Sequence, residues 1–117
     1  MSEESTGNPQ LSNGTAIEYK AYARKFGGES GAVLYLIATC AYPTGGYEIF
    51  FEAEYGLQTF KLMEIPPGLA PQLVTYYVAS WTSSQRLVDP PEQVTMVDAH
   101  GEHRVAVMPW DYLAAGA

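Results

Sequence analysis

The stretch "AVLYLIATCAYPTGGYEIFF", residues 32–51, decides the fold class of this chain. Ala32 to Tyr42 is apolar on both faces and rich in β-branched and aromatic residues, which is typical of a central strand covered on both sides. From Tyr47 to Ala53 apolar and polar residues alternate, which predicts a half-buried strand. Between them, Gly45 and Gly46 permit the backbone conformations that a tight turn needs. The glycines also let a partner's backbone approach closely, so the turn is a candidate contact loop.

Further strands are predicted on both sides of this stretch. Period-two alternation predicts one from Thr15 to Arg24, and another from Gln58 to Ile65 as the hairpin partner of the Tyr47 strand. A second hairpin is predicted from Gln93 to Met108, where Gly101 can take the positive φ of the turn. Leu73 to Trp81 favours a strand by composition, and one helix over residues 72–82 is the alternative.

Together these segments predict an all-β fold. We expect an immunoglobulin-like antiparallel β-sandwich of about seven short strands, because turn signals recur at regular spacing. A small β-barrel is the alternative. The polar segment 1–13 is expected to be a flexible tail, followed by a single domain over residues 14–117.

The composition excludes several classes of partner and fold. The net charge of −7 repels phosphate backbones and anionic lipid, so we expect neither nucleic acid nor a membrane as partner. No apolar run approaches the roughly 20 residues that span a bilayer. Cys40 is the only cysteine, which excludes a disulfide scaffold. We therefore expect a cytoplasmic protein.

One cluster of potential metal ligands lies in the second hairpin. Asp98, His100, Glu102 and His103 are all residue types that bind zinc, and both histidines of the chain are here. Their spacing matches no closed zinc motif, and hairpin tips are commonly polar because they are solvated. We therefore expect no metal and no other cofactor, with these four residues as the candidates if a metal does bind.

No catalytic constellation can be assembled from the remaining residues. Glu48, Glu52 and Glu54 point outward by alternation and are expected to form a solvated face, paired with Lys61 across the hairpin. Cys40 shares a strand face with apolar residues, which predicts a buried, inert thiol. We therefore predict that the protein is not an enzyme.

The aromatic content indicates a binding role. Nine tyrosines and two tryptophans supply large contact areas with a polar handle, which suits recognition surfaces, although strands and cores also favour aromatic residues. The two apolar faces of Ala32 to Tyr42 need cover on both sides. If Leu73 to Trp81 is a strand, a second chain is expected to supply that cover, which predicts a weak homodimer.

The loop Pro43-Thr44-Gly45-Gly46-Tyr47 resembles the "PTGGY" segment of the PrcB-type protease-complex-associated domains of bacteria. In those domains a proline-rich stretch and a strand follow, and residues 64–68 and 71–76 are similar to that part. The resemblance covers roughly Val33 to Val78 and implies a protein partner, with a protease as the candidate.

The same loop is similar to the "NPTTGY" loop of chagasin-type cysteine-protease inhibitors, which are immunoglobulin-like sandwiches. Pro109-Trp110 is similar to their "RPW" loop. Tyr42, Gly45 and Met108 stand where that family has asparagine, threonine and arginine. The resemblance implies a protease-inhibitor-like module, whose contact residues in this chain would be Thr44, Gly45, Gly46, Tyr47 and Trp110.

Overall fold

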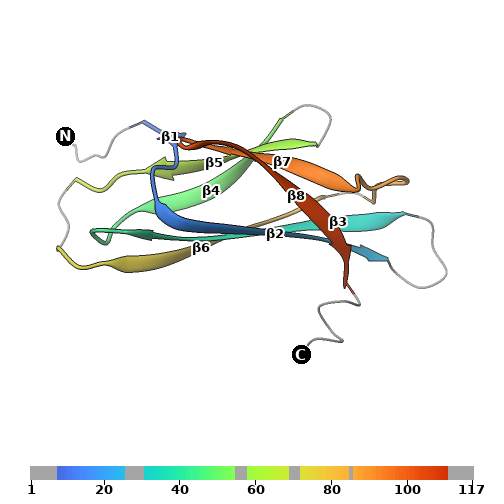
Figure 1. Ribbon diagram of the computed structural model, residues 1–117, viewed down its shortest axis with the longest axis horizontal. Coiled ribbons are helices and arrows are strands. Elements are labelled where there is room, and N and C mark those ends of the chain that lie inside the picture. The colour runs from blue at the N-terminus through green and yellow to red at the C-terminus, as the bar shows by residue number, and fades with distance from the viewer. Residues whose placement is uncertain (1–7, 26–30, 55–57, 69–71, 85, 111–117) are drawn as a thin grey trace.

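The computed structural model describes residues 8–25, 31–54, 58–68, 72–84 and 86–110. These residues form eight β-strands (Figure 1). The strands are β1 (Gln10–Leu11), β2 (Thr15–Lys25), β3 (Ala32–Tyr42), β4 (Glu48–Ala53), β5 (Thr59–Ile65), β6 (Thr75–Thr82), β7 (Gln93–Asp98) and β8 (Gly101–Pro109). In the part of the chain that the structure describes, no helix is long and apolar enough to cross a membrane.

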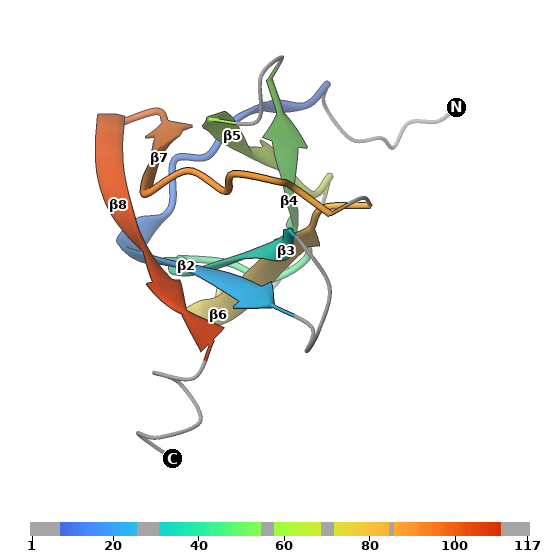
Figure 2. The ribbon, with the colours of Figure 1, turned by 90° about the vertical axis from the view of Figure 1, so that its right-hand side faces the viewer.

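The strands form one curled sheet in the order β1-β5-β7-β8-β2-β3-β6, and β4 pairs with β5 beside this path. β4, β5 and β7 face β2, β3 and β6, and β8 joins the two layers (Figure 2). β8 pairs with β7 antiparallel and with the end of β2 in parallel, and β5 with β7 is a second parallel pair. The all-β prediction is confirmed, and the curled sheet is consistent with both a sandwich and a small barrel. The two parallel pairs depart from a fully antiparallel sheet.

The central strand of the sequence prediction has the predicted bounds. β3 lies between β2 and β6, with an unbroken antiparallel register to β6 from Tyr35↔Thr82 to Tyr42↔Thr75. Its even-numbered residues from Ala32 to Cys40 are buried, whereas Val33 to Thr39 on the other face are half-buried. The second face of β3 is therefore covered only in part.

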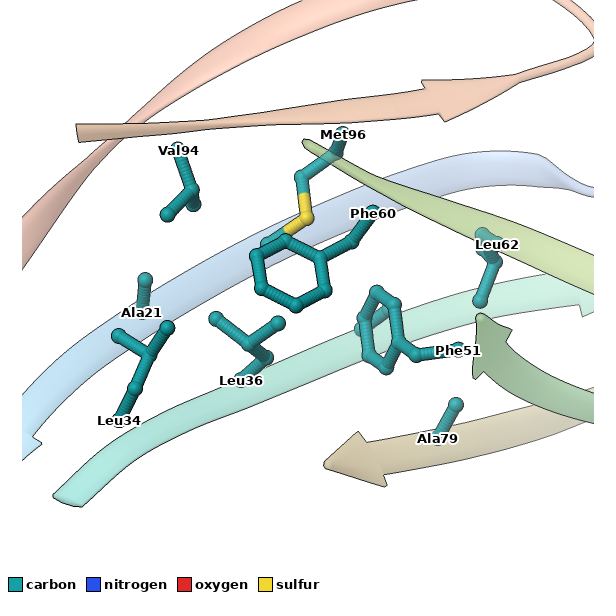
Figure 3. Close-up of a cluster of buried hydrophobic side chains, with 10 residues drawn as sticks. Ala21, Leu34, Leu36, Phe51, Phe60, Leu62, Ala79, Val94 and Met96 are labelled. Carbon is teal, nitrogen blue, oxygen red and sulfur yellow. The ribbon is translucent and has the colours of Figure 1, made fainter. Parts of the chain in front are cut away.

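The core fills the space between the two layers (Figure 3). Phe60 of β5 is wholly buried there, and its ring lies 4.9 Å from that of Trp81 on β6. Burying a large apolar side chain contributes about 1.5–3 kcal/mol, so this cluster holds the layers together. Its members are Ala21, Leu34, Leu36, Ala38, Phe51, Phe60, Leu62, Ala79, Val94 and Met96.

Both predicted hairpins are present. β4 pairs with β5 from Glu48↔Ile65 to Ala53↔Phe60. β7 pairs with β8 across a turn at Ala99 and His100, and Gly101 takes a φ of 128°, a conformation that residues with a side chain rarely adopt. Within the segment 72–82, residues 75–82 form a strand and none forms a helix, because the β-branched and aromatic residues pair with β3 along the whole of β6.

The expectation of a flexible tail through residue 13 is wrong for its last part. Gln10 and Leu11 pair with β5, and Ser12 is fully buried. The Ser12 N–H donates to the Leu62 carbonyl at 2.8 Å, and the Ser12 carbonyl accepts from Ala99 at 2.9 Å. These backbone bonds outweigh the polar composition that suggested a tail. Residues 1–7 of the predicted tail lie outside the described residues.

Candidate functional site

The loop that resembles the protease-binding loops is packed against its own sheet. The ring of Tyr47 stacks on that of Tyr42 at 3.9 Å, and both make edge contacts with Tyr77 of β6. The Tyr47 N–H donates to the Tyr77 hydroxyl at 3.1 Å, and Gly46 takes a φ of 86° that a turn here requires. Thr44 and Gly45 are half-buried, and Gly45 lies beside Thr75 and Tyr77 of β6. The loop is thus a folded turn with a tyrosine cluster, and its aromatic side chain is committed to internal contacts.

Trp110, the fifth residue of the predicted contact surface, lies at the opposite end of β3 from residues 44–47. Its ring contacts Tyr22 and Tyr35, and the Arg24 guanidinium lies 5.3 Å from the ring centroid. Tyr35 and Tyr42 are seven residues apart in one strand, which corresponds to roughly 23 Å. The structure therefore does not bring Trp110 together with residues 44–47. Trp110 instead borders a pocket of about 600 Å³.

The second hairpin brings the side chains of two of the four candidate metal ligands, Asp98 and His103, together, whereas the His100 ring bonds to the Gly14 carbonyl at 2.8 Å. Asp98 is buried, and its carboxylate accepts from the Tyr19 hydroxyl at 2.6 Å and from the His100 N–H at 2.8 Å. His103 Nε2 donates to the same carboxylate at 3.1–3.2 Å. Glu102 is exposed and pairs in register with Val97, on the opposite face of β8 from His103. Residues 99–102 therefore form the exposed tip that the sequence predicted, and only Asp98 at its base is a buried polar contact.

The electrostatics of this contact keep Asp98 ionised. Burial alone would raise the pKa of Asp98, but the hydrogen bonds from Tyr19, His100 and His103 together hold it below its ordinary value. Burial, and then the bond to Asp98, raise the pKa of Tyr19, so its hydroxyl stays protonated and donates. Asp98 therefore fastens β2 to the β7–β8 turn through a charge-assisted bond.

A pocket of about 360 Å³ opens beside Asp98, where β2 and β8 diverge. The two strands pair only at Ala21–Ala23 with Val107–Pro109, and the pocket lies toward their other ends. Ala16 in its wall has a φ of 51°, and the register of β2 shifts between Thr15 and Glu18. Strain and bulges of this kind are common beside binding sites. Among the described residues, however, no group of three or more histidine, cysteine, aspartate or glutamate side chains is arranged to hold a metal ion.

Cys40 and Glu64 are two further buried residues with polar or ionisable side chains. Burial raises the pKa of the Cys40 thiol, which disfavours the nucleophilic thiolate. A side chain at Gly14 would come within 3.2 Å of Cys40, so the chain can cross here only as glycine or by shifting its neighbours. Glu64 accepts from Gln10, Asn13 and Tyr42 at 2.6–2.8 Å. These bonds explain why the segment before β2 is fixed to the sheet.

Among the described residues, the most exposed apolar surface lies on and before β6, and it was not predicted from the sequence. Five large apolar side chains are exposed among the described residues, and four of them fall within residues 73–78. Tyr76 is 78% exposed and Val78 is 68% exposed, whereas the fifth, Val88, lies in a loop. β6 ends the strand path and pairs only with β3 among the described strands. One sequence signal was available, because no charged residue occurs between Glu64 and Arg86.

The opposite edge of the sheet is charged. β4 carries Glu48 and Glu52, both exposed as predicted. Glu54 follows β4 and forms an ion pair of 3.4 Å with Lys61 across the hairpin, so the predicted pairing with Lys61 is confirmed for this residue. Both side chains are about 40% exposed, and such surface pairs contribute little stability.

Comparison with known proteins adds no relative to this description. No protein-family model, curated protein or solved structure matches the chain. The resemblance to PrcB-type domains and to chagasin-type inhibitors stays a prediction from the loop residues. We therefore infer the function from the geometry of the described residues.

Proposed function

We propose that this chain is a non-catalytic binding protein that engages a protein partner through strand β6. The observation that carries the proposal is the clustering of exposed apolar side chains at residues 73–78 on an edge strand. An edge strand offers unpaired backbone groups along with its side chains, and adding a partner's strand there is a common mode of protein recognition.

The charge of the chain supports a protein partner. A net charge of −7 opposes binding to nucleic acid and to anionic lipid. Within the all-β class we propose an immunoglobulin-like arrangement, which the two packed layers and the antiparallel hairpins support. We also propose a cytoplasmic location, which the single buried Cys40 supports.

The alternatives from the sequence fit the geometry less well. A protease-inhibitor-like module needs Tyr47 and Trp110 on one contact surface, but these residues lie at opposite ends of β3 and pack against their own chain. A metal site or metal-dependent enzyme at the second hairpin needs free ligand atoms. The carboxylate oxygens of Asp98 are already bonded to three neighbouring residues.

A site-specific photo-crosslinker in the native cell tests the proposal. A benzophenone amino acid replaces Val78 in one variant and Val88 in the control, since both positions are highly exposed and apolar. We expect a discrete protein adduct from position 78 and little from position 88. Equal labelling at both positions would contradict a binding role for β6, and mass spectrometry of the adduct identifies the partner.

A further inference from the structure

We infer that the partner strand of β6 is β6 of a second copy of this chain, joined antiparallel across a two-fold axis so that the two sheets become one. The inference rests on the proposed function and names its partner. It differs from the dimer expected from sequence, in which the second face of β3 was the contact.

β6 lacks the features by which edge strands avoid pairing. Natural edges carry charged residues, proline or bulges that prevent a further strand from adding. The sequence of β6, TYYVASWT, has no charge and no proline, and its register with β3 runs without a bulge from Thr75 to Thr82. An unprotected edge of eight residues is long enough to form several inter-chain hydrogen bonds.

The backbone of β6 determines which residues would form these bonds. The Ser83 N–H donates to the Leu34 carbonyl at 3.0 Å, which continues the β3–β6 register by one pair. Because bonded pairs alternate in an antiparallel ladder, Tyr77 and Ala79 also direct their backbone groups to β3. Val78 and its even-numbered neighbours therefore direct their N–H and C=O groups to the free edge.

The pleat fixes the register that a second copy can adopt. Residues opposite each other in a sheet must point to the same face, so even-numbered residues pair with even-numbered residues. Near the middle of β6, this places Val78 opposite either Val78 or Ser80 of the second copy. In both registers Val78 lies in a hydrogen-bonded pair close to the two-fold axis, beside the exposed ring of Tyr76.

The acidic net charge does not oppose this pairing. β3 and β6 are both free of charged residues, so the first charges on the outer face are those of β2, namely Glu18, Lys20 and Arg24. In the joined sheet, β2 and its copy are five strand spacings apart, or about 24 Å. This separation exceeds the Debye length of about 8 Å at physiological ionic strength, so repulsion between the copies is screened.

The charged edge explains why association would stop at two copies. Joining β6 of one copy to β4 of another would build an open chain, but the two glutamates Glu48 and Glu52 protect β4. β4 also approaches β6 near the contact of Tyr47 with Tyr77 and crosses away from it (Figure 1). Pairing of β6 with β6 uses the one long unprotected edge that each copy has among its described strands. The assembly is therefore complete at two copies.

Sedimentation equilibrium of the full chain over a dilution series tests the inference. We expect a dimer that dissociates on dilution. Val78→Lys should weaken association by at least about tenfold, because it removes an apolar contact and places a lysine in each copy close to the two-fold axis. The matched control Val88→Lys changes charge and exposure in the same way and should leave association unchanged.

Three results would overturn the inference. They are a wild-type monomer at every concentration, a Val78→Lys dimer as tight as the wild type, and equal weakening by Val88→Lys. If Val78→Lys fails to fold by circular dichroism, Val78→Pro takes its place, since it removes an N–H that β3 does not use. A wild-type monomer that still gives an adduct with another protein from position 78 would refute the dimer and leave the proposed function standing.

Discussion

β4 and β6 are both edge strands of the curled sheet, and the two edges differ in charge. β4 carries Glu48 and Glu52, whereas β6 carries no charge and exposes Tyr76 and Val78. Both strands pack one face on the same core, so the difference is confined to the face and edge that meet solvent. Core packing therefore does not explain it. A charged edge resists further pairing, and an uncharged apolar edge favours it.

The largest loss of folding stability is expected from a substitution on the inner face of the sheet, which packs on the core. Leu36→Glu places a carboxylate in the core and should cost about 4 kcal/mol or more, enough to unfold a domain of ordinary stability. Val78→Glu, on the outer face of β6, should leave the fold intact. Circular dichroism with thermal unfolding measures both. A folded Leu36→Glu variant would contradict the assignment of inner and outer faces.

Proline substitutions distinguish the bonded side of β6 from its free side. Ala79→Pro removes an N–H that pairs with β3 and crowds a buried position, so we expect a loss of about 3 kcal/mol. Val78→Pro removes only an N–H on the free edge and should cost less than about 1 kcal/mol while abolishing association. Urea unfolding of dilute samples gives the free energies. Equal losses would mean that both sides of β6 are bonded within one chain.

The buried contact of Asp98 lies away from both edges and should affect stability alone. Tyr19→Phe removes a 2.6 Å hydrogen bond to a buried carboxylate, so we expect a loss of about 1.5–3 kcal/mol at neutral pH and no change in association. Denaturant unfolding combined with sedimentation checks both statements. A shift in the dimer equilibrium would show that the edges are coupled to this contact.

The same contact sets a pH dependence with a defined sign. The pKa of Asp98 is lower in the folded chain than its ordinary value near 4, so its contribution to stability is present above that pH. The contribution is lost as the pH falls through the folded pKa. The difference in unfolding free energy between wild type and Tyr19→Phe should therefore shrink between pH 5 and the most acidic pH at which both variants fold.

Removing the charges of β4 should convert the protected edge into a second unprotected one. The double variant Glu48→Thr, Glu52→Thr replaces two exposed carboxylates with a residue that strands favour, so its stability should change by no more than about 0.5 kcal/mol. Association should become open-ended, with species larger than two copies in light scattering. A variant that behaves as the wild type would show that these charges do not limit pairing.

Much of the fold was predictable because it depends on local patterns. β3 has the bounds that its apolar run predicted, and the positive φ of Gly101 follows from the turn that it makes. The two parallel pairs, β2 with β8 and β5 with β7, join strands that are distant in sequence, so no local pattern reports them. β1 was missed because its pairing depends on bonds to Glu64 and Leu62 rather than on its own composition.

The candidate site was less predictable than the fold. Asp98 looked solvated in a polar hairpin tip, but Tyr19 and His103 reach it from another strand and from across the turn. Tyr47 and Trp110 looked like one contact surface because the sequence does not reveal at which end of β3 Trp110 lies. The edge position of β6 likewise depends on long-range pairing. The lack of charge in β6 was visible in the sequence, but it indicates a binding edge only once the strand is known to lie at the edge of the sheet.

Residue-resolved amide hydrogen exchange tests the central claim, that β6 presents a free edge to a second copy, most directly. In a dilute sample the amides of Tyr77 and Ala79 should be protected by β3, and those of Tyr76, Val78 and Ser80 should exchange freely. Raising the protein concentration should protect these three amides and leave the first two unchanged. Free exchange of Val78 at every concentration, or its full protection at infinite dilution, would contradict the account.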